Sequence, residues 1–82
     1  MITKYRGDLV AETTHAGALL TIDVPDSEGA PTAHGARGTT CIVSREHGKS
    51  VVGARALNAQ NRVAVYRMGG ADGPVFTAVV VK

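Results

Sequence analysis

Aromatic side chains are scarce in this chain of 82 residues. There is no tryptophan, and the only phenyl or phenol rings are those of Tyr5, Tyr66 and Phe76. Large rings usually dominate the burial of apolar surface in cores and interfaces. Valine, alanine, leucine and isoleucine must replace them here, which predicts a thin core. Since a chain of this length forms one domain and buries only about 60–65% of the surface that its unfolded form exposes, we expect its stability to depend on a partner.

Cysteine is almost absent as well. Cys41 is the only one, which excludes a disulfide within the chain and argues against a secreted disulfide scaffold. It lies in the β-branched stretch TTCIVS, where we expect a small buried hydrophobe and not a reactive thiol. A zinc site can be written down from Cys41, His34 and His47, but these residues lack the paired short spacings of structural zinc sites. We therefore expect no metal and no cofactor.

Long apolar runs are also missing. The longest uninterrupted ones extend over only a few residues, so we expect no membrane-spanning segment. The first residues, MITKYRGDLV, lack the apolar segment of a signal peptide. We expect a chain that is made in the cytoplasm of its host cell.

Patterns that carry catalysis are not evident. Ser44, Glu46 and His47 are close in sequence, but neighbours on a strand or turn point in different directions, and no nucleophile elbow is present. The acidic residues of segment 23–28 lie in or beside an expected loop, where carboxylates are usually solvated. The GARG segment, residues 35–38, resembles a phosphate-binding glycine loop, but a β-prone segment follows it in place of a helix. These patterns favour a protein that is not an enzyme.

Charge is unevenly distributed along the chain, although the formal net charge is only +2. Residues 1–28 hold two basic and five acidic side chains, whereas residues 37–67 hold six basic side chains and one acidic one. Such an asymmetry is typical of nucleic-acid binding. It is equally typical of self-assembly in which the acidic part of one subunit faces the basic part of the next. A solvated surface is the third interpretation.

Alternating apolar and polar residues predict strands more clearly than helices. In residues 18–24, Leu20, Ile22 and Val24 share one face, and Pro25 ends the strand because proline cannot donate to a ladder. Four further strands are expected, at residues 39–45, 50–57, 62–68 and 75–81.

Glycine-rich and polar segments mark the connections. The stretches EHGK, NAQN and GGADGP are turn signals, and Gly48 supplies a positive φ to the first of them. Gly53 lies inside an expected strand, which predicts a bulge or a close backbone contact there. Residues 25–40 show no periodicity and are rich in proline, glycine, serine and threonine, so we expect a long loop that contacts a partner.

Together these patterns predict one small all-β domain over residues 1–82. We expect a small barrel or sandwich of about five short strands with a long Gly/Pro-rich loop at residues 25–40. Residues 1–8 form a candidate partner-binding arm, and residues 9–20 have room for one helical turn.

The stretch VVGARALNAQNRVAVYRMGG, residues 51–70, resembles a segment of the head decoration (capsid cement) proteins of tailed bacteriophages. Those small β-rich proteins have a VG-x-A strand, then a short turn rich in Ala, Asp, Asn or Gln, then a V-x-V/T-x-Y/L strand and a glycine. The matching residues are Val52, Gly53, Ala54 and Ala56 in the first strand, Asn58, Ala59 and Gln60 in the turn, and Val63, Val65, Tyr66 and Gly69 at the end.

This resemblance implies a structural role in a virion. Decoration proteins bind the outer surface of an expanded capsid, commonly as trimers at threefold positions, and clamp neighbouring major capsid subunits against the pressure of the packaged DNA. The implied partners are the major capsid protein and further copies of this chain in a homotrimer. The Gly/Pro/Ala-rich arm of lambda-type members is not obvious, so MITKYRGDL would have to serve in its place. We expect partner binding through Ile2, Lys4, Tyr5, Arg6, Arg37, Arg62 and Arg67, and strand addition to a neighbour through residues 2–6 or 77–81.

Nucleic-acid binding by a small basic β-barrel is the alternative. Arg62 and Arg67 flank an expected strand, and three further basic residues lie between positions 45 and 55, so a basic face could neutralise several phosphates. Single-strand platforms also stack bases on aromatic rings, and only Tyr66 is placed for this. On a strand, Arg62 and Tyr66 share one face while Arg67 takes the other. An accessory subunit of an intracellular complex is a third hypothesis.

Overall fold

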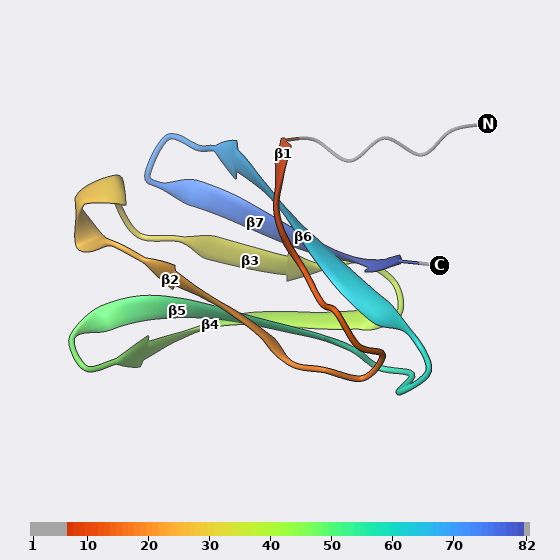
Figure 1. Cartoon of the computed structure of the whole chain (residues 1–82). Helices are drawn as coiled ribbons and strands as arrows, with labels where there is room; N and C mark the ends of the chain where they lie inside the picture. Colours follow the sequence, from red (N-terminus) through yellow and green to blue (C-terminus); the bar gives the residue numbers. More distant parts are fainter. Residues whose placement is uncertain (1–6, 82) are drawn as a thin grey trace.

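A computed structural model describes residues 7–81, which form a sandwich of two β-sheets (Figure 1). The elements in chain order are β1 (Asp8–Glu12), β2 (Leu20–Val24), the 3-10 turn η1 (Asp26–Glu28), β3 (Thr32–Gly35), β4 (Thr39–Glu46), β5 (Lys49–Ala56), β6 (Arg62–Gly69) and β7 (Pro74–Val81). Sheet A has the strand order β1-β6-β7-β3, and sheet B has the order β2-β5-β4. The two sheets do not join into a closed barrel. The sequence predicted either a barrel or a sandwich, and the structure is a sandwich.

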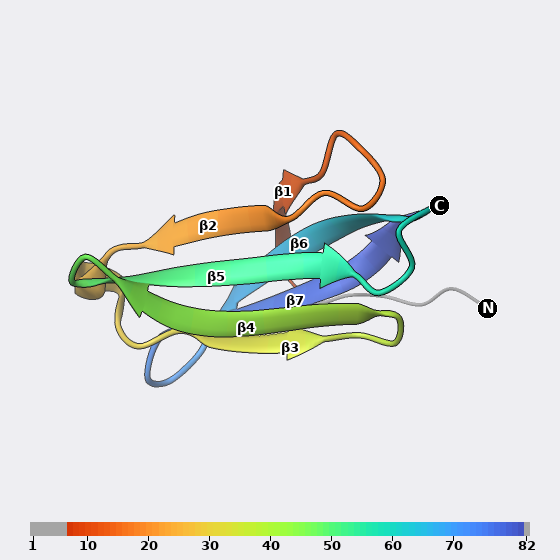
Figure 2. The ribbon, with the colours of Figure 1, turned by 90° about the horizontal axis from the view of Figure 1, so that it is seen from below.

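Strand pairing is antiparallel except between β3 and β7, which run parallel. Figure 2 shows β2, β5 and β4 side by side in one layer, with β6 and β7 in the layer behind them. The all-β prediction is therefore confirmed, and the five expected strands correspond to β2, β4, β5, β6 and β7.

The turn between β4 and β5 follows the sequence prediction closely. Glu46 pairs with Lys49, so only His47 and Gly48 form the loop. Their φ angles are 53° and 80°. Two positive φ values in a two-residue loop are typical of the type I′ turn, whose twist matches that of the flanking strands.

Two strands were not anticipated. Strand β1 occupies the start of the segment in which we expected a helical turn, and β3 divides the segment 25–40 in which we expected one long loop. The register of β1 shifts between Leu9 and Ala11, which removes the regular alternation that identifies a strand. Strand β3 has the sequence TAHG, which has little β propensity of its own and forms a strand because β7 supplies a distant partner.

Gly53 corrects a second expectation. It pairs with Thr21 on one side and with Ile42 on the other, in a register that runs without interruption. A Cβ atom built on Gly53 would meet nothing within 4 Å. The glycine therefore marks neither a bulge nor a close backbone contact.

The stretch 51–70 contains two strands separated by a turn, but these strands do not pair with each other. Strand β5 is central in sheet B, β6 pairs with β1 and β7 in sheet A, and the connection at residues 57–61 crosses between the sheets. Strand β7 is also flanked on both sides, by β6 and β3. Within the described residues, 77 and 78 are paired on both sides, whereas residues 79–81 pair with β6 alone, so strand addition through segment 77–81 is restricted to its last three residues.

The core lies between the inner faces of the two sheets. Its buried members are Val24, Cys41, Val52 and Ala54 from sheet B, and Val63, Val65, Phe76 and Ala78 from sheet A. Phe76 supplies the only aromatic ring of this cluster, so the core is built almost entirely from small aliphatic groups. Cys41 is buried within it, as the sequence predicted.

Two buried threonines close the ends of the strands. The Thr13 hydroxyl accepts a hydrogen bond of 3.0 Å from the Val63 backbone nitrogen and so extends the pairing of β1 with β6. The Thr39 hydroxyl donates to the Ala36 carbonyl at 2.7 Å and lies 3.3 Å from the Ala78 carbonyl. These contacts fix the turn at residues 36–38 against β7, which connects the two sheets at that end of the sandwich.

Candidate interaction surfaces

The residues expected to bind a partner are not gathered at one place. Ile2, Lys4, Tyr5 and Arg6 lie outside the described residues. Among the others, Arg37 lies in the turn between β3 and β4, Arg62 begins β6, and Arg67 lies near the end of the same strand. The last two are five residues apart, which corresponds to about 17 Å along a strand.

Arg67 differs from the other two because it is held within the chain. Its Nη2 atom donates to Glu28 Oε1 at 2.6 Å, and its Nε atom is buried with no hydrogen-bond partner among residues 7–81. It has the same strand parity as the buried Val63 and Val65, so it points toward the gap between the sheets. Arg67 therefore ties β6 to η1, while its side chain stays 41% exposed.

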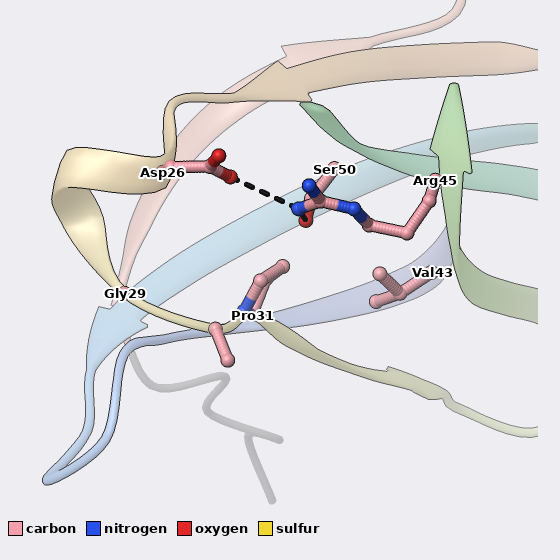
Figure 3. A pocket seen from close by; sticks show the side chains of 7 residues that line it. Asp26, Gly29, Pro31, Val43, Arg45 and Ser50 are labelled. Atoms are coloured by element: carbon pink, nitrogen blue, oxygen red, sulfur yellow. Dashed lines mark hydrogen bonds and ion pairs between the residues drawn. The ribbon is translucent and has the colours of Figure 1, made fainter. Parts of the chain in front are cut away.

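Arg45 is held even more fully, beside a hollow of about 370 Å³ at the same end of the sandwich (Figure 3). Its Nη1 atom donates to Asp26 Oδ1 at 2.9 Å and to Ser50 Oγ at 3.1 Å, and its Nη2 atom donates to the Gly48 carbonyl at 2.8 Å. Pro31 and Val43 provide apolar walls to this hollow. The network connects β4, β5 and η1, so its first effect is to brace the open side of the sandwich.

A third ion pair completes this end of the molecule, where Lys49 Nζ lies 3.5 Å from Asp23 Oδ2. The three acidic side chains of segment 23–28 are thus each paired with a basic side chain of the central region. We call this the ion-pair end. Every partner in these pairs is more than a third exposed, so each pair contributes at most about 1 kcal/mol to stability. The charge asymmetry of the sequence is therefore largely neutralised inside the chain at this end.

The opposite end of the sandwich carries three arginines without such partners. Arg37, Arg55 and Arg62, which we call the arginine pole, form no ion pair with any acidic side chain of residues 7–81. They come from the β3–β4 turn, the end of β5 and the start of β6, and these segments meet at this end. The sequence placed Arg37 and Arg62 among the expected partner-binding residues and Arg55 only in the basic face of the nucleic-acid alternative. By strand parity Arg55 faces outward from sheet B, whereas Arg62 faces outward from sheet A.

The outer face of sheet B has a shallow hollow of about 290 Å³ beside the arginine pole. Leu19, Ile42, Gly53 and Arg55 are among its lining residues, and Glu46 lines the end farther from the pole. The side chains of Leu19 and Ile42 are 58% and 66% exposed. The hollow exists because Gly53 has no side chain at the centre of the sheet. In the sequence, Ile42 follows Cys41 on an expected strand, and the alternation of faces along a strand indicates that Ile42 points outward when Cys41 is buried.

A further exposed leucine, Leu57, lies just beyond the end of β5. It follows β5 directly and is 69% exposed, and its backbone nitrogen donates to the Gly38 carbonyl at 2.8 Å. This bond joins the β5–β6 connection to the turn that carries Arg37. Exposed leucine and arginine side chains therefore share one end of the molecule.

The candidate metal ligands are dispersed. His34 lies on β3, His47 lies in the hairpin at the ion-pair end, and no group of three or more potential metal ligands occurs in the part of the chain that the structure describes. Cys41 is close to the backbone of His34 and Ala78, but burial dominates and raises the pKa of its thiol. Gly35 belongs to β3, and the Ala36 amide is bonded to the Ala78 carbonyl, so GARG is part of the pairing of β3 with β7 and not an open phosphate loop.

No helix within residues 7–81 is long and apolar enough to cross a membrane. No family model matches the chain, and comparison with curated proteins and with solved structures gives no significant match.

Proposed function

We propose that this chain is a non-enzymatic structural protein of a viral particle, a decoration protein that binds the outer surface of the capsid and stabilises the shell. Its partners in this proposal are the major capsid protein and further copies of itself in a homotrimer. The proposal rests on the resemblance of residues 51–70 and on the surface of the folded domain.

The observation that carries the proposal is the pair of exposed apolar side chains, Leu19 and Ile42, that line the hollow on the outer face of sheet B. Large apolar side chains that are exposed together among polar ones are typical of a site that contacts another protein. Strand β4, at the edge of sheet B, also offers unpaired backbone groups next to these side chains, with Ile42–Glu46 exposed. A protein surface that covers the two side chains and the edge would supply the stability that the thin core does not.

The test is the number of copies of this chain in purified particles from its source, measured by quantitative mass spectrometry. We expect a ratio near one copy for each major shell subunit. Absence from the particles, or a few copies in each, would contradict the proposal. Deletion of Met1–Arg6 is expected to weaken binding to particles far more than it lowers the melting temperature of the free domain, as an arm that clamps the shell would require.

The arginine pole favours nucleic-acid binding as a second candidate function. Arg37, Arg55 and Arg62 form no ion pair within residues 7–81, whereas Arg67 is bonded to Glu28. This candidate predicts a steep loss of affinity for single-stranded DNA with rising salt, and each of Arg55→Ala and Arg62→Ala should reduce the slope of log K against log salt by roughly one. An affinity that does not depend on salt would exclude it.

A further inference from the structure

We propose that β4 pairs antiparallel with β4 of a second copy of this chain, about a two-fold axis through Ser44, so that the two copies of sheet B form one continuous sheet. The inference goes beyond the proposed function and does not rest on it, because the contact follows from the strand itself. The proposed trimer belongs to the threefold positions of a shell, whereas this contact forms a dimer of free chains.

Strand β4 is the least protected of the four edge strands. Sheet A ends at β1, whose register is shifted, and at β3, which has only four residues. Sheet B ends at β4 and at β2, which has five residues and is followed by Pro25. Strand β4 has eight residues in an unbroken register with β5, and it contains neither proline nor lysine. Since short strands, bulges, prolines and lysines usually protect an edge from pairing, β4 is the edge that is open to a partner strand.

The charged residue of β4 that faces inward is bound within its own domain. Arg45 shares strand parity with the buried Cys41, and an inward-pointing charge on an edge strand normally discourages pairing. Here the guanidinium donates to Asp26 at 2.9 Å, to Ser50 at 3.1 Å and to the Gly48 carbonyl at 2.8 Å. The charge is thereby neutralised on the side of its own β5 and η1, and the backbone edge of β4 stays free.

The backbone groups at this edge follow from the type I′ turn. A two-residue turn makes Glu46 and Lys49 a hydrogen-bonded pair, and such pairs alternate with non-hydrogen-bonded ones along an antiparallel ladder. The N–H and C=O groups of Val43 and Arg45 therefore point away from β5. The Thr39 amide has the same parity, and it bonds to the adjacent turn and not to β5, as this phase requires. Among residues 7–81, no strand pairs with this side of β4.

A second copy fits this edge because the exposed part of β4 is complementary to itself. The last five residues of β4 are all exposed, and Ser44 is their centre. With a two-fold axis there, Val43 opposes Arg45 of the second copy, and the two exchange backbone hydrogen bonds. Ile42 opposes Glu46 of the second copy, so like charges do not face each other and each face of the strand meets the same face of its partner.

Other arrangements of the two strands are less favourable. An axis one residue closer to the turn would place Arg45 opposite Arg45 of the second copy, and like charges directly opposite each other are destabilising. An axis one residue farther from the turn would require Cys41 at the contact, and Cys41 is buried. Pairing of β4 with a different edge of the second copy would leave one β4 uncovered, whereas the two-fold contact covers both.

The contact also covers the hollow at the open side of the sandwich. Sheet A has four strands and sheet B has three, and the hollow of about 370 Å³ lies where sheet B ends, with Ala30, Pro31 and Val43 among its walls (Figure 3). In the paired sheet, Arg45 of the second copy lies opposite Val43, so that its aliphatic part packs against this valine. The dimer thus buries apolar surface that the thin core of one copy leaves exposed.

The experiment measures the mass of the full chain by sedimentation equilibrium at several concentrations. We expect a dimer, with twice the chain mass of 8.5 kDa, to predominate at roughly 100 μM, which requires a dissociation constant in the micromolar range. Val43→Pro removes an N–H that points to the partner, and Thr21→Pro removes one that points away from β5 at the opposite edge of the same sheet. We expect Val43→Pro to weaken dimerisation by more than about tenfold and Thr21→Pro to change it by less than about twofold.

A cysteine at the axis tests the register. Ser44 faces Ser44 of the second copy in a non-hydrogen-bonded pair, whose Cα atoms lie about 4.5 Å apart, within the range of a disulfide. We expect Ser44→Cys to form a disulfide-linked dimer with oxidised glutathione. Thr40→Cys, on the same exposed face of β4, is the matched control, and it should stay mainly monomeric in denaturing gels because position 40 lies beyond the paired residues. Cys41 is common to both variants and is buried.

Several results would overturn the proposal. A monomer or a trimer at roughly 100 μM excludes the two-fold contact. Equal weakening by Val43→Pro and Thr21→Pro, in variants that thermal melts show to be folded, excludes β4 as the contact. If Val43→Pro does not fold, equal cross-linking of Ser44→Cys and Thr40→Cys, or none in either, decides against the pairing. These results are separate from the copy number in particles, because a monomeric chain present at one copy for each shell subunit would refute the dimer and leave the proposed function standing.

Discussion

Replacement of Gly53 by valine is expected to stabilise the domain. The glycine lies at the centre of β5, between Thr21 and Ile42, and an added Cβ atom would meet nothing within 4 Å. Glycine within a strand is unfavourable by about 0.5–1 kcal/mol relative to alanine because the unfolded chain has more freedom to lose. A β-branched side chain between two cross-strand neighbours adds about 0.2–1 kcal/mol for each pair. The free energy of unfolding should therefore rise by about 1–3 kcal/mol.

Urea denaturation followed by circular dichroism measures this change. For a domain of this size the melting temperature should also rise, by about 4–8 °C for each kcal/mol. Gly35→Ala is the matched control within a strand, because a Cβ atom on Gly35 would lie 2.9 Å from the backbone oxygen of Thr39, and crowding of this kind is destabilising by about 1–3 kcal/mol. A loss of stability in Gly53→Val would refute the open environment described for this glycine.

Three further predictions follow from the core and the turns. Phe76→Ala should lower the free energy of unfolding by about 3–5 kcal/mol, which is a large part of the roughly 4–12 kcal/mol expected for a domain of this length, and a loss below about 1 kcal/mol in urea titrations would contradict its central position. Burial raises the pKa of Cys41 above its ordinary value of 9.0, so the folded state holds the thiol proton more tightly. Stability should therefore fall as pH rises past about 9. Denaturation measured at several pH values should show that Cys41→Ala lacks this pH-dependent loss of stability. Thiol-reactive dyes should label the native protein slowly. Gly73→Ala should destabilise the domain strongly, because Gly73 has a φ of 154° and a Cβ atom would overlap the Ala30 carbonyl, whereas Gly69→Ala, with open space, should be nearly neutral in thermal melts.

Local sequence signals were enough for the strands that carry their own pattern. Leu20, Ile22 and Val24 alternate with exposed residues in β2 as expected, and EHGK forms the predicted turn. The strands that were missed depend on long-range pairing. The irregular register near Leu9 hides β1, and the TAHG segment becomes a strand only beside β7. No local pattern carries that information, because each strand is specified by residues about forty or more positions away.

The candidate surfaces were predictable in composition but not in position. An excess of basic residues at positions 37–67 was evident, yet the sequence does not indicate that Arg67 reaches Glu28 or that Arg45 reaches Asp26. The sequence placed Arg62 and Arg67 at the two ends of one strand and on different faces of it, and β6 has them so. The partners of a charged side chain are set by which strand ends meet, and this is a property of the topology.

The topology also decides which charged side chains stay unpaired. Acidic and basic residues that are far apart in the sequence meet at one end of the sandwich and not at the other. Strand β2 leads into η1 at the end where the β4–β5 hairpin turns, so the acidic segment 23–28 meets the basic residues at that end only. The basic residues at the far ends of β5 and β6 have no comparable acidic segment beside them.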